Sequence, residues 1–254
     1  MGMSQSKLNT YVRCPHLYKL LYIDGIKFVK TVPLLIGIVA HKVMENCGNL
    51  LPQKMNVRQI YSDAAKSIIN ELGLGLSKQQ YAEIYYPVIS MLDVFYSNYP
   101  SNKPLAVERK FSLPYKNLTM TGVFDVIDQE ANKLFILDYK SGKFMASDWL
   151  SLLSSFQTVI YQWAAEQIYG KPFTVKYWWL RWDETRTLNI TSEIRAKTFR
   201  KISNIAVKIN RCEFEHNPSS ACQSCPAMAT CIPGQKFIVD NTRICRKLPE
   251  PLLI

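Results

Sequence analysis

Residues 118–140 decide the fold of this chain and read LTMTGVFDVIDQEANKLFILDYK. Two runs rich in β-forming residues, 118–128 and 133–140, flank a short polar stretch, and this pattern predicts a β-hairpin. A turn in the polar stretch sets Asp125 of the first strand directly opposite Asp138 of the second. Two carboxylates are therefore expected at one edge of an otherwise apolar sheet.

Lys140 follows Asp138 by two residues, and the two share one face because side chains alternate along a strand. Paired carboxylates on rigid strands suit a hard cation such as Mg²⁺. A lysine beside them can hold an attacking water or offset charge on a phosphate. An Asp-x-Lys triplet is also common by chance, and such a pair is usually a solvated ion pair. The apolar run 135–137 favours the site, because charges that end a buried strand are costly unless they are paired or bind a metal.

Composition and charge narrow the class of protein. The chain has 254 residues, 48% of them hydrophobic, so one large domain, or a core with a small appendage, can form. The formal net charge of +11 favours a polyanionic partner such as nucleic acid. No apolar run is long enough to cross a bilayer, and residues 1–7 lack the apolar core of an export signal. We therefore expect a cytoplasmic protein without a membrane partner, located in the host cytoplasm or nucleoid if the chain is viral.

The chain is predicted to be helical before the hairpin and mixed after it. Helical spacing and stop signals predict helices over 6–21, 34–50, 57–72 and 77–99. β-Forming residues predict strands over 105–113 and 173–182, with a helix over 149–169 before the last strand. The step from the hairpin through this helix to the last strand suits a parallel crossover. The order predicts an α/β fold with a mixed central sheet of about four strands flanked by helices.

A predicted helix over 191–211 carries a basic stripe. Five cations fall on one narrow face at a 3.6-residue period: Lys197, Arg200, Lys201, Lys208 and Arg211. Such a stripe is usually a solvated face, and with this net charge contact with nucleic-acid phosphates is an equal alternative. The tail from 213 to 254 holds most of the cysteines and many prolines. We expect the tail to be loop-rich and held by something other than an apolar core.

Seven cysteines in a chain without an export signal argue against a disulfide framework. Three of them form the compact array Cys222-x2-Cys225-x5-Cys231, whose short spacings let thiolates face a common centre. Three unrelated thiols are the alternative, and the close spacing argues against it. Both Zn²⁺ and an iron–sulfur cluster accept four thiolates, so the residues alone do not separate them. The candidates for a fourth ligand are Cys14, Cys212 and Cys245.

Polar residues in other predicted elements are further candidates. His41 lies on an apolar helix, where a lone histidine is more often a satisfied core residue than a ligand. Gln157 and Tyr161 are one helical turn apart and project from one face. This pair could contact a phosphate or position Lys140, or it could be a routine buried polar pair. Glu108 lies in the predicted strand 105–113 and could face the site, but its orientation is ambiguous.

Together these motifs resemble those of the PD-(D/E)xK nucleases, in the RecB-like branch that carries an iron–sulfur cluster. The CRISPR-associated exonucleases and the AddB-type recombination nucleases belong to that branch. Each motif is weak alone, and six in the same order are specific. Over residues 14–231 they are Tyr-x2-Cys14-Pro, Gly37-x3-His41, Gly122-x2-Asp125, Asp138-Tyr139-Lys140, Gln157-x3-Tyr161 and the cysteine array. The resemblance implies a restriction-endonuclease-like core.

The resemblance also implies a role for the acidic motifs. Asp125 and Asp138 are similar to the ligands of Mg²⁺ or Mn²⁺ in this family, with His41 as a further ligand. The backbone carbonyl of Tyr139 is implied as another ligand. Lys140 is similar to the catalytic lysine that orients the water nucleophile.

The remaining motifs resemble parts that bind DNA or hold the tail. Gln157 and Tyr161 match a motif that packs beside the site and contacts DNA. Four cysteines match the ligands of a 4Fe-4S cluster that clamps the C-terminal tail, with Zn²⁺ as the alternative: Cys14, Cys222, Cys225 and Cys231. The expected domains are a helical region over 1–100, a nuclease core over 101–190, and a basic helix with a cluster-binding tail over 191–254.

The expected function follows the resemblance. Many CRISPR-associated members have Glu in place of Asp138, so the Asp-Tyr-Lys motif is closer to the RecB type. The chain lacks the phosphate-binding loop of a helicase motor. We therefore expect a stand-alone, metal-dependent DNA nuclease of repair or recombination, an exonuclease on single strands or free ends rather than an endonuclease. Partners in a nuclease complex or in CRISPR adaptation are implied as well. The alternative is a non-catalytic DNA-binding or scaffold protein of the same fold, and the intact acids and lysine argue against it.

Overall fold

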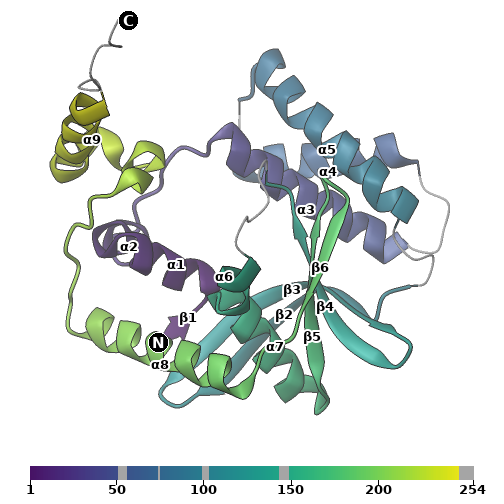
Figure 1. Cartoon of the computed structure of the whole chain (residues 1–254). Helices are drawn as coiled ribbons and strands as arrows, with labels where there is room; N and C mark the ends of the chain where they lie inside the picture. Colours follow the sequence, from purple (N-terminus) through teal and green to yellow (C-terminus); the bar gives the residue numbers. More distant parts are fainter. Residues whose placement is uncertain (51–55, 74, 99–102, 143–148, 246–254) are drawn as a thin grey trace, which may run out of the picture. The chain divides into compact units, whose positions relative to one another are not determined.

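The computed structural model of the protein describes residues 1–50, 56–73, 75–98, 103–142 and 149–245 (Figure 1). Contacts divide the chain into two compact units. The first, here called the sheet unit, comprises Met1–Met3 and Lys30–Thr198. The second, here called the cysteine unit, comprises Ser4–Val29 and Phe199–Ile254. Each unit draws on separate parts of the chain, and the three consecutive domains expected from the sequence stay a prediction.

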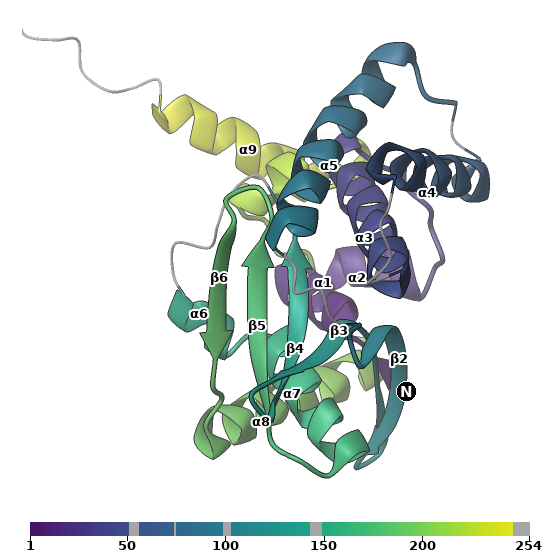
Figure 2. The same cartoon turned by 90° about the vertical axis from the view of Figure 1, so that its right-hand side faces the viewer.

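A mixed sheet forms the sheet unit (Figures 1 and 2). In the part of the chain that is described, its six strands are β1 (Gly2–Met3), β2 (Ala106–Tyr115), β3 (Leu118–Glu130), β4 (Lys133–Lys140), β5 (Phe173–Trp179) and β6 (Glu184–Leu188). β3 pairs with β1, β2 and β4, and β5 lies between β4 and β6. The β1–β3 and β4–β5 pairs are parallel, and the other pairs are antiparallel.

The sheet confirms the predicted α/β class and exceeds the predicted strand number. About four strands were expected, and two more are present. β1 is only two residues long, which is too short to show a hydrophobic pattern. β6 has mostly exposed or half-exposed side chains, so its sequence lacks the alternation that marks a half-buried strand.

The β3–β4 hairpin has the predicted register. It closes with the two-residue turn Ala131–Asn132, where both residues have positive φ, 44° and 68°. Turns of this kind match the twist of the two flanking strands. The β3–β4 ladder ends at Val126 and Leu137, although β4 stays paired with β5 beyond that point. Asp125 and Asp138 are the next residues on their strands, so both lie where the hairpin ladder opens.

Helices pack on both faces of β4. The predicted helices over 34–50, 57–72 and 77–99 are α3 (Val32–Leu50), α4 (Val57–Leu72) and α5 (Lys78–Asn98), and Tyr99 lies outside the described residues. These helices share one apolar cluster with Phe135, Leu137 and Tyr139 of β4. Because β4 side chains alternate, Asp138 and Lys140 point to the other face.

The predicted helix over 149–169 is broken into α6 (Trp149–Leu153) and α7 (Phe156–Tyr169). The side chain of Ser155 accepts a hydrogen bond from the backbone N–H of Thr158 and caps α7. A capping residue has non-helical backbone, so the helix starts anew after it. The serines at 154 and 155 carried this signal in the sequence. Gly170 ends α7 in the left-handed conformation, as its position predicts.

The predicted helix over 6–21 in the cysteine unit is also broken, into α1 (Gln5–Arg13) and α2 (Pro15–Tyr22). Cys14 between them is extended, with φ −162° and ψ 112°. A residue before proline avoids the helical region, and proline suits the first position of a new helix. The sequence placed Cys14 within one continuous helix. In the structure Cys14 is instead the extended residue between two helices, because of the Cys-Pro dipeptide.

The tail is more helical than expected. α8 (Ser192–Asn210) confirms the predicted helix over 191–211, and the short 3₁₀ turns η1 (Ser220–Ser224) and η2 (Met228–Thr230) follow. The loop-rich prediction is wrong for α9 (Ile232–Cys245), because a proline at 233 is compatible with the first turn of a helix. Among the helices that the structure describes, none combines the length and the apolar character that crossing a membrane requires.

Candidate functional site

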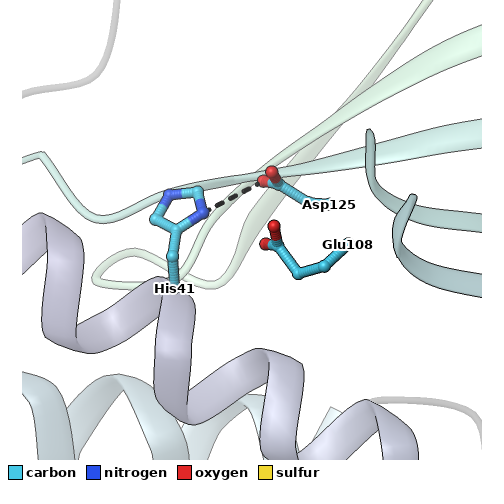
Figure 3. Close-up of side chains that lie close together, drawn as sticks. All are labelled: His41, Glu108 and Asp125. Atoms are coloured by element: carbon cyan, nitrogen blue, oxygen red, sulfur yellow. Dashed lines mark ion pairs between the residues drawn. The ribbon is translucent and has the colours of Figure 1, made fainter. Parts of the chain in front are cut away.

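A histidine and two carboxylates converge in the sheet unit. His41 comes from α3, Glu108 from β2 and Asp125 from β3, and one ligand atom of each lies within 4.8 Å of the others. Figure 3 shows the three side chains pointing toward one another from a helix and two strands. Nδ1 of His41 lies 3.4 Å from Oδ2 of Asp125. A set of one imidazole and two carboxylates can hold a divalent cation.

Strand register brings the two carboxylates together. In the β2–β3 ladder Val107 pairs with Val126, so the next residues, Glu108 and Asp125, lie across from one another. Glu108 has a φ of +47°, a conformation that is uncommon for residues other than glycine. Strained backbone of this kind gathers at functional sites. Glu108 is thus held beside Asp125 by the fold of the two strands.

The charges of this cluster raise the pKa values of His41 and Glu108. Burial lowers the pKa of His41, but the Asp125 carboxylate outweighs burial, and the pKa rises to about 9. Burial, with the Asp125 carboxylate next to it, raises the pKa of Glu108 to about 7. The cluster therefore holds extra protons near neutral pH. A divalent cation would replace those protons, because its positive charge would offset the same clustered carboxylates.

Asp138 belongs to an adjoining group with Lys140 and Gln157. Nζ of Lys140 lies 2.5 Å from Oδ2 of Asp138 and donates a hydrogen bond to Oε1 of Gln157 at 2.8 Å. Nε2 of Gln157 donates to Oδ1 of Asp138 at 2.5 Å. The Asp138 side chain is 1% exposed and that of Lys140 is 29% exposed. The three groups hold one another, and the ammonium is the member that reaches solvent.

Burial and pairing decide the charges of this group. Burial raises the pKa of Asp138 against the opposing effect of Lys140, and the Asp125 carboxylate raises it further. Burial lowers the pKa of Lys140, but Asp138 outweighs burial and the net shift is upward. Lys140 is therefore a cation at neutral pH. Oδ2 of Asp138 is buried and accepts from the Lys140 ammonium at 2.5 Å, and a carboxylate oxygen has a second lone pair that suits a cation.

Asp125 joins the two groups. Its Oδ2, the atom that faces His41, accepts a hydrogen bond from the backbone N–H of Tyr139 at 2.9 Å. Tyr139 lies between Asp138 and Lys140 on β4. The structure thus brings together the five predicted catalytic and metal-binding residues His41, Asp125, Asp138, Tyr139 and Lys140. The role of the Tyr139 carbonyl as a ligand stays a prediction.

Gly122 lets aromatic rings close over this part of the sheet. A Cβ at Gly122 would lie 2.5 Å from Cζ of Phe111 and 3.1 Å from Cε1 of Tyr161. Tyr161 meets Phe111 and Phe124 edge-on and is 6% exposed. Tyr161 therefore packs beside the site, one helical turn from Gln157. Its contact with DNA stays a prediction.

The predicted cluster ligands line one pocket of the cysteine unit: Cys14, Cys222, Cys225 and Cys231. Gly234 also lines it, and a Cβ there would lie 3.3 Å from Sγ of Cys231 and 3.5 Å from Sγ of Cys222. Cys212 is exposed, Cys47 is buried in the sheet unit, and the side chain of Cys245 lies outside the described residues.

The four cysteines line one pocket and offer thiolates, which both Zn²⁺ and an iron–sulfur cluster accept. The donor set therefore fits either group.

The basic stripe is exposed along α8. Lys197 and Arg200 are exposed, and Arg211 lies 4.0 Å from Glu213. Lys201 and Lys208 also line a pocket of the cysteine unit, together with residues of α1 and of the segment after α8. The stripe thus presents its charge to solvent, and its contact with DNA stays a prediction.

Comparisons with known proteins name a family. The model of the PD-(D/E)XK nuclease superfamily matches residues 2–232. The chain belongs to the PD-(D/E)XK nuclease superfamily. The structure resembles that of a candidate exonuclease from Eubacterium rectale, with 13% identity, a TM-score of 0.53, and coverage of 99% of this chain and 90% of that one. It also matches SSO0001 with 14% identity, a TM-score of 0.42, and coverage of 92% and 87%. No curated protein sequence matches.

Sequence reasoning left one residue of the PD-(D/E)XK site unassigned. Glu108 lies across from Asp125, but its positive φ breaks the simple alternation of side chains along β2. The sequence did contain a signal. Tyr115 and Leu118 pair across a tight turn of two residues, which fixes the register of the two strands. Counting back along both strands from that turn places Glu108 opposite Asp125. In this nuclease the candidate ligand set is thus larger than the motifs alone indicate.

Proposed function

We propose that this nuclease hydrolyses phosphodiester bonds of DNA with a divalent cation, Mg²⁺ or Mn²⁺, as a stand-alone exonuclease on single strands or free ends. One observation carries the proposal. The cluster of His41, Glu108 and Asp125 adjoins a buried carboxylate, Asp138, that is paired with a partly exposed lysine. A cation site beside an ammonium is what an attack of water on a phosphodiester needs.

The first group would hold the cation. His41, Glu108 and Asp125 supply three convergent ligand atoms, and the buried carboxylate of Asp138, whose Oδ2 is paired with Lys140, adjoins them with a further lone pair. The backbone carbonyl of Tyr139 is a further predicted ligand. When bound, the cation supplies Lewis-acid polarisation of the phosphate and a lowered pKa for a bound water. His41 and Glu108 would bind it in their deprotonated forms.

Lys140 would act on the water or on a phosphate oxygen. Asp138 and Gln157 restrain its ammonium, so its position does not depend on substrate. Asp138 keeps it charged, because the ion pair outweighs the effect of burial on the pKa of the lysine. An ammonium fixed in this way stabilises the charge that develops on the phosphate during attack.

DNA contact is proposed for two further regions. Gln157 and Tyr161 adjoin Lys140 and Gly122, where a strand of substrate would pass. The basic stripe supplies charge that phosphates attract: Lys197, Arg200, Lys201, Lys208 and Arg211.

A 4Fe-4S cluster is proposed for the cysteine unit, with Zn²⁺ as the alternative. The four cysteines around one pocket support it. Hydrogen bonds already tie the N-terminal helices to the tail within this unit, from Tyr11 to Glu213 at 2.7 Å and from Arg13 to Ala221 at 2.6 Å. The cluster would strengthen the same connection. A brown protein with broad visible absorbance that bleaches on reduction would establish it, and a colourless protein with stoichiometric zinc would exclude it.

The proposed activity is tested with end-labelled single-stranded DNA in Mn²⁺. Lys140→Met removes the ammonium and should abolish cleavage while the circular dichroism spectrum stays unchanged. Lys176→Met is the matched control, because Lys176 lies on the neighbouring strand β5 and pairs with Glu130 instead. Full activity in the Lys140 variant would exclude the assigned site. Circular single-stranded DNA should resist the enzyme, and its degradation would show an endonuclease.

The alternative, a non-catalytic DNA-binding or scaffold protein, would bind the same DNA and leave it intact at every metal concentration. The complete set of acids and lysine favours the enzyme, since a protein that only binds has no need of a buried Asp–Lys pair. Partners in a nuclease complex or in CRISPR adaptation, and a role in repair or recombination, stay predictions from the resemblance.

A further inference from the structure

A groove of about 480 Å³ opens beside the candidate metal ligands in the sheet unit. Its wall is apolar, formed by Pro33, Leu34 and Ile38 of α3 and by Ile68 of α4. His41 and Glu108 line the same groove. Two of the three candidate metal ligands therefore line an apolar groove whose volume lies in the range of small-molecule sites.

The apolar wall begins at the core and ends in solvent, because Ile68 and Ile38 pack in or against the apolar cluster whereas Pro33 and Leu34 are exposed. Leu34, Ile38 and His41 follow one another at helical spacing, so they lie along one stripe. Leu35 and Val39 are buried in the apolar cluster, whereas Leu34 is 52% exposed. A single exposed leucine is ordinary. Here the exposed leucine continues through the partly buried Ile38 to His41, so the apolar wall leads directly to a candidate metal ligand.

We propose that this groove receives the base of the nucleotide next to the scissile phosphate, in a single strand or a frayed end. The inference rests on the proposed function, because the cluster of His41, Glu108 and Asp125 sets where the phosphate lies. His41 and Glu108 line both the cluster and the groove, so the nucleoside that flanks a phosphate held there lies at the groove. Leu34 and Ile38 are then specificity-determining residues.

The chemistry of the groove selects an unpaired base. Apolar side chains pack against the face of any base, and in a duplex both faces are covered by stacking. The polar groups at the groove, Lys42 and Glu45, are paired with each other at 2.8 Å. They are therefore not free to read base edges. The groove should accept all four bases and reject a paired one.

The test compares normal and abasic nucleotides in single-stranded DNA. The wild-type protein should pause in Mn²⁺ where an abasic nucleotide enters the groove, with kcat/KM lower by about five- to tenfold, the equivalent of about half a buried leucine contact. Leu34→Ser should lower kcat/KM for normal DNA by a similar factor and leave the abasic position unchanged. The loss should lie in KM, since Leu34 contacts no reacting atom.

Leu105→Ser is the matched control, because Leu105 is 51% exposed and does not line the groove. A binding readout accompanies the rates. In the Lys140→Met background, fluorescence anisotropy should show weaker binding of abasic than of normal oligonucleotides, and Leu34→Ser should remove that difference.

Two results separate the inference from the proposed function. A wild-type enzyme that degrades DNA equally well at normal and abasic nucleotides would overturn the groove assignment and leave the nuclease intact. A protein with no metal-dependent cleavage of any substrate would overturn the proposed function itself. The comparison of normal and abasic DNA uses the wild-type protein alone, so it still decides the question if the Leu34→Ser variant folds poorly.

Discussion

The acidic site of the sheet unit and the thiol site of the cysteine unit are built in different ways. The acidic site is held by strand register and by contacts among its own side chains, such as the 3.4 Å approach of His41 to Asp125 and the Asp138–Lys140 pair. The thiol site is assembled from a helix break and two short 3₁₀ turns. The first site should therefore keep its shape without a cation, whereas the second should depend on the metal group proposed for it.

The largest expected effect is on catalysis at the acidic site. Asp125→Asn keeps the shape of the side chain but removes the charge of a proposed ligand, so activity in Mn²⁺ should fall by about 10²–10³-fold or more. The metal-free protein should stay folded, with its melting temperature lowered only by the loss of the His41–Asp125 ion pair. Rates on labelled single-stranded DNA and thermal melts check both. Asp128→Asn on the same strand is the control, because Asp128 is similarly buried and lies outside the cluster.

A change at the thiol site should act on structure instead. Cys225→Ser removes one of the four proposed ligands, and structural metal sites often supply most of the folding energy of the segments they join. We expect the tail to be cut by protease at least about tenfold faster. Cys212→Ser, an exposed cysteine outside the pocket, should behave as wild type. Equal protease resistance in both variants would mean that the cysteine unit is held by its hydrogen bonds alone.

A smaller effect is expected from closing the space above Gly122. Gly122→Ala places a methyl group 2.5 Å from the Phe111 ring, so the ring or the strand must shift. Overpacking of this kind costs about 1–3 kcal/mol of stability. Urea denaturation measures the loss. Gly2→Ala is the control, because no atom lies within 4 Å of a Cβ there. An unchanged midpoint for Gly122→Ala would show that the ring moves freely.

The smallest effect concerns pH. His41 has its pKa raised from 6.5 to about 9, so its contribution to stability is complete below pH 6.5 and is lost as pH rises through 9. Glu108 has its pKa raised to about 7, so its burial also costs stability as pH rises through 7. The metal-free protein should therefore melt at lower temperature at pH 9 than at pH 6.5.

Mn²⁺ should reverse this trend, because it binds the deprotonated ligands. Melting curves at both pH values, with and without Mn²⁺, measure the difference. His41→Gln should flatten the pH dependence of the metal-free protein. A wild-type melting temperature that is the same at pH 6.5 and 9 would contradict the charge coupling between His41 and Asp125.

The sequence by itself determined much of the local structure. The β3–β4 register followed from two β-forming runs around a short turn, and α4 has its predicted bounds of 57–72. The order of six short motifs pointed to the PD-(D/E)XK nucleases, and the family model matches nearly the whole chain. These features are local, because each depends on neighbours within a few residues or on a spacing along the chain.

Only the tertiary structure decided which side chains meet. Glu108 joins His41 and Asp125 because the β2–β3 register and a left-handed backbone bring it there, and alternation along β2 could not show this. The pairing of Asp138 with Gln157 depends on how α7 packs against β4, and the exposure of Leu34 depends on how α3 packs in the core. Packing energy is shared among residues far apart in the chain, so no single stretch of sequence contains it.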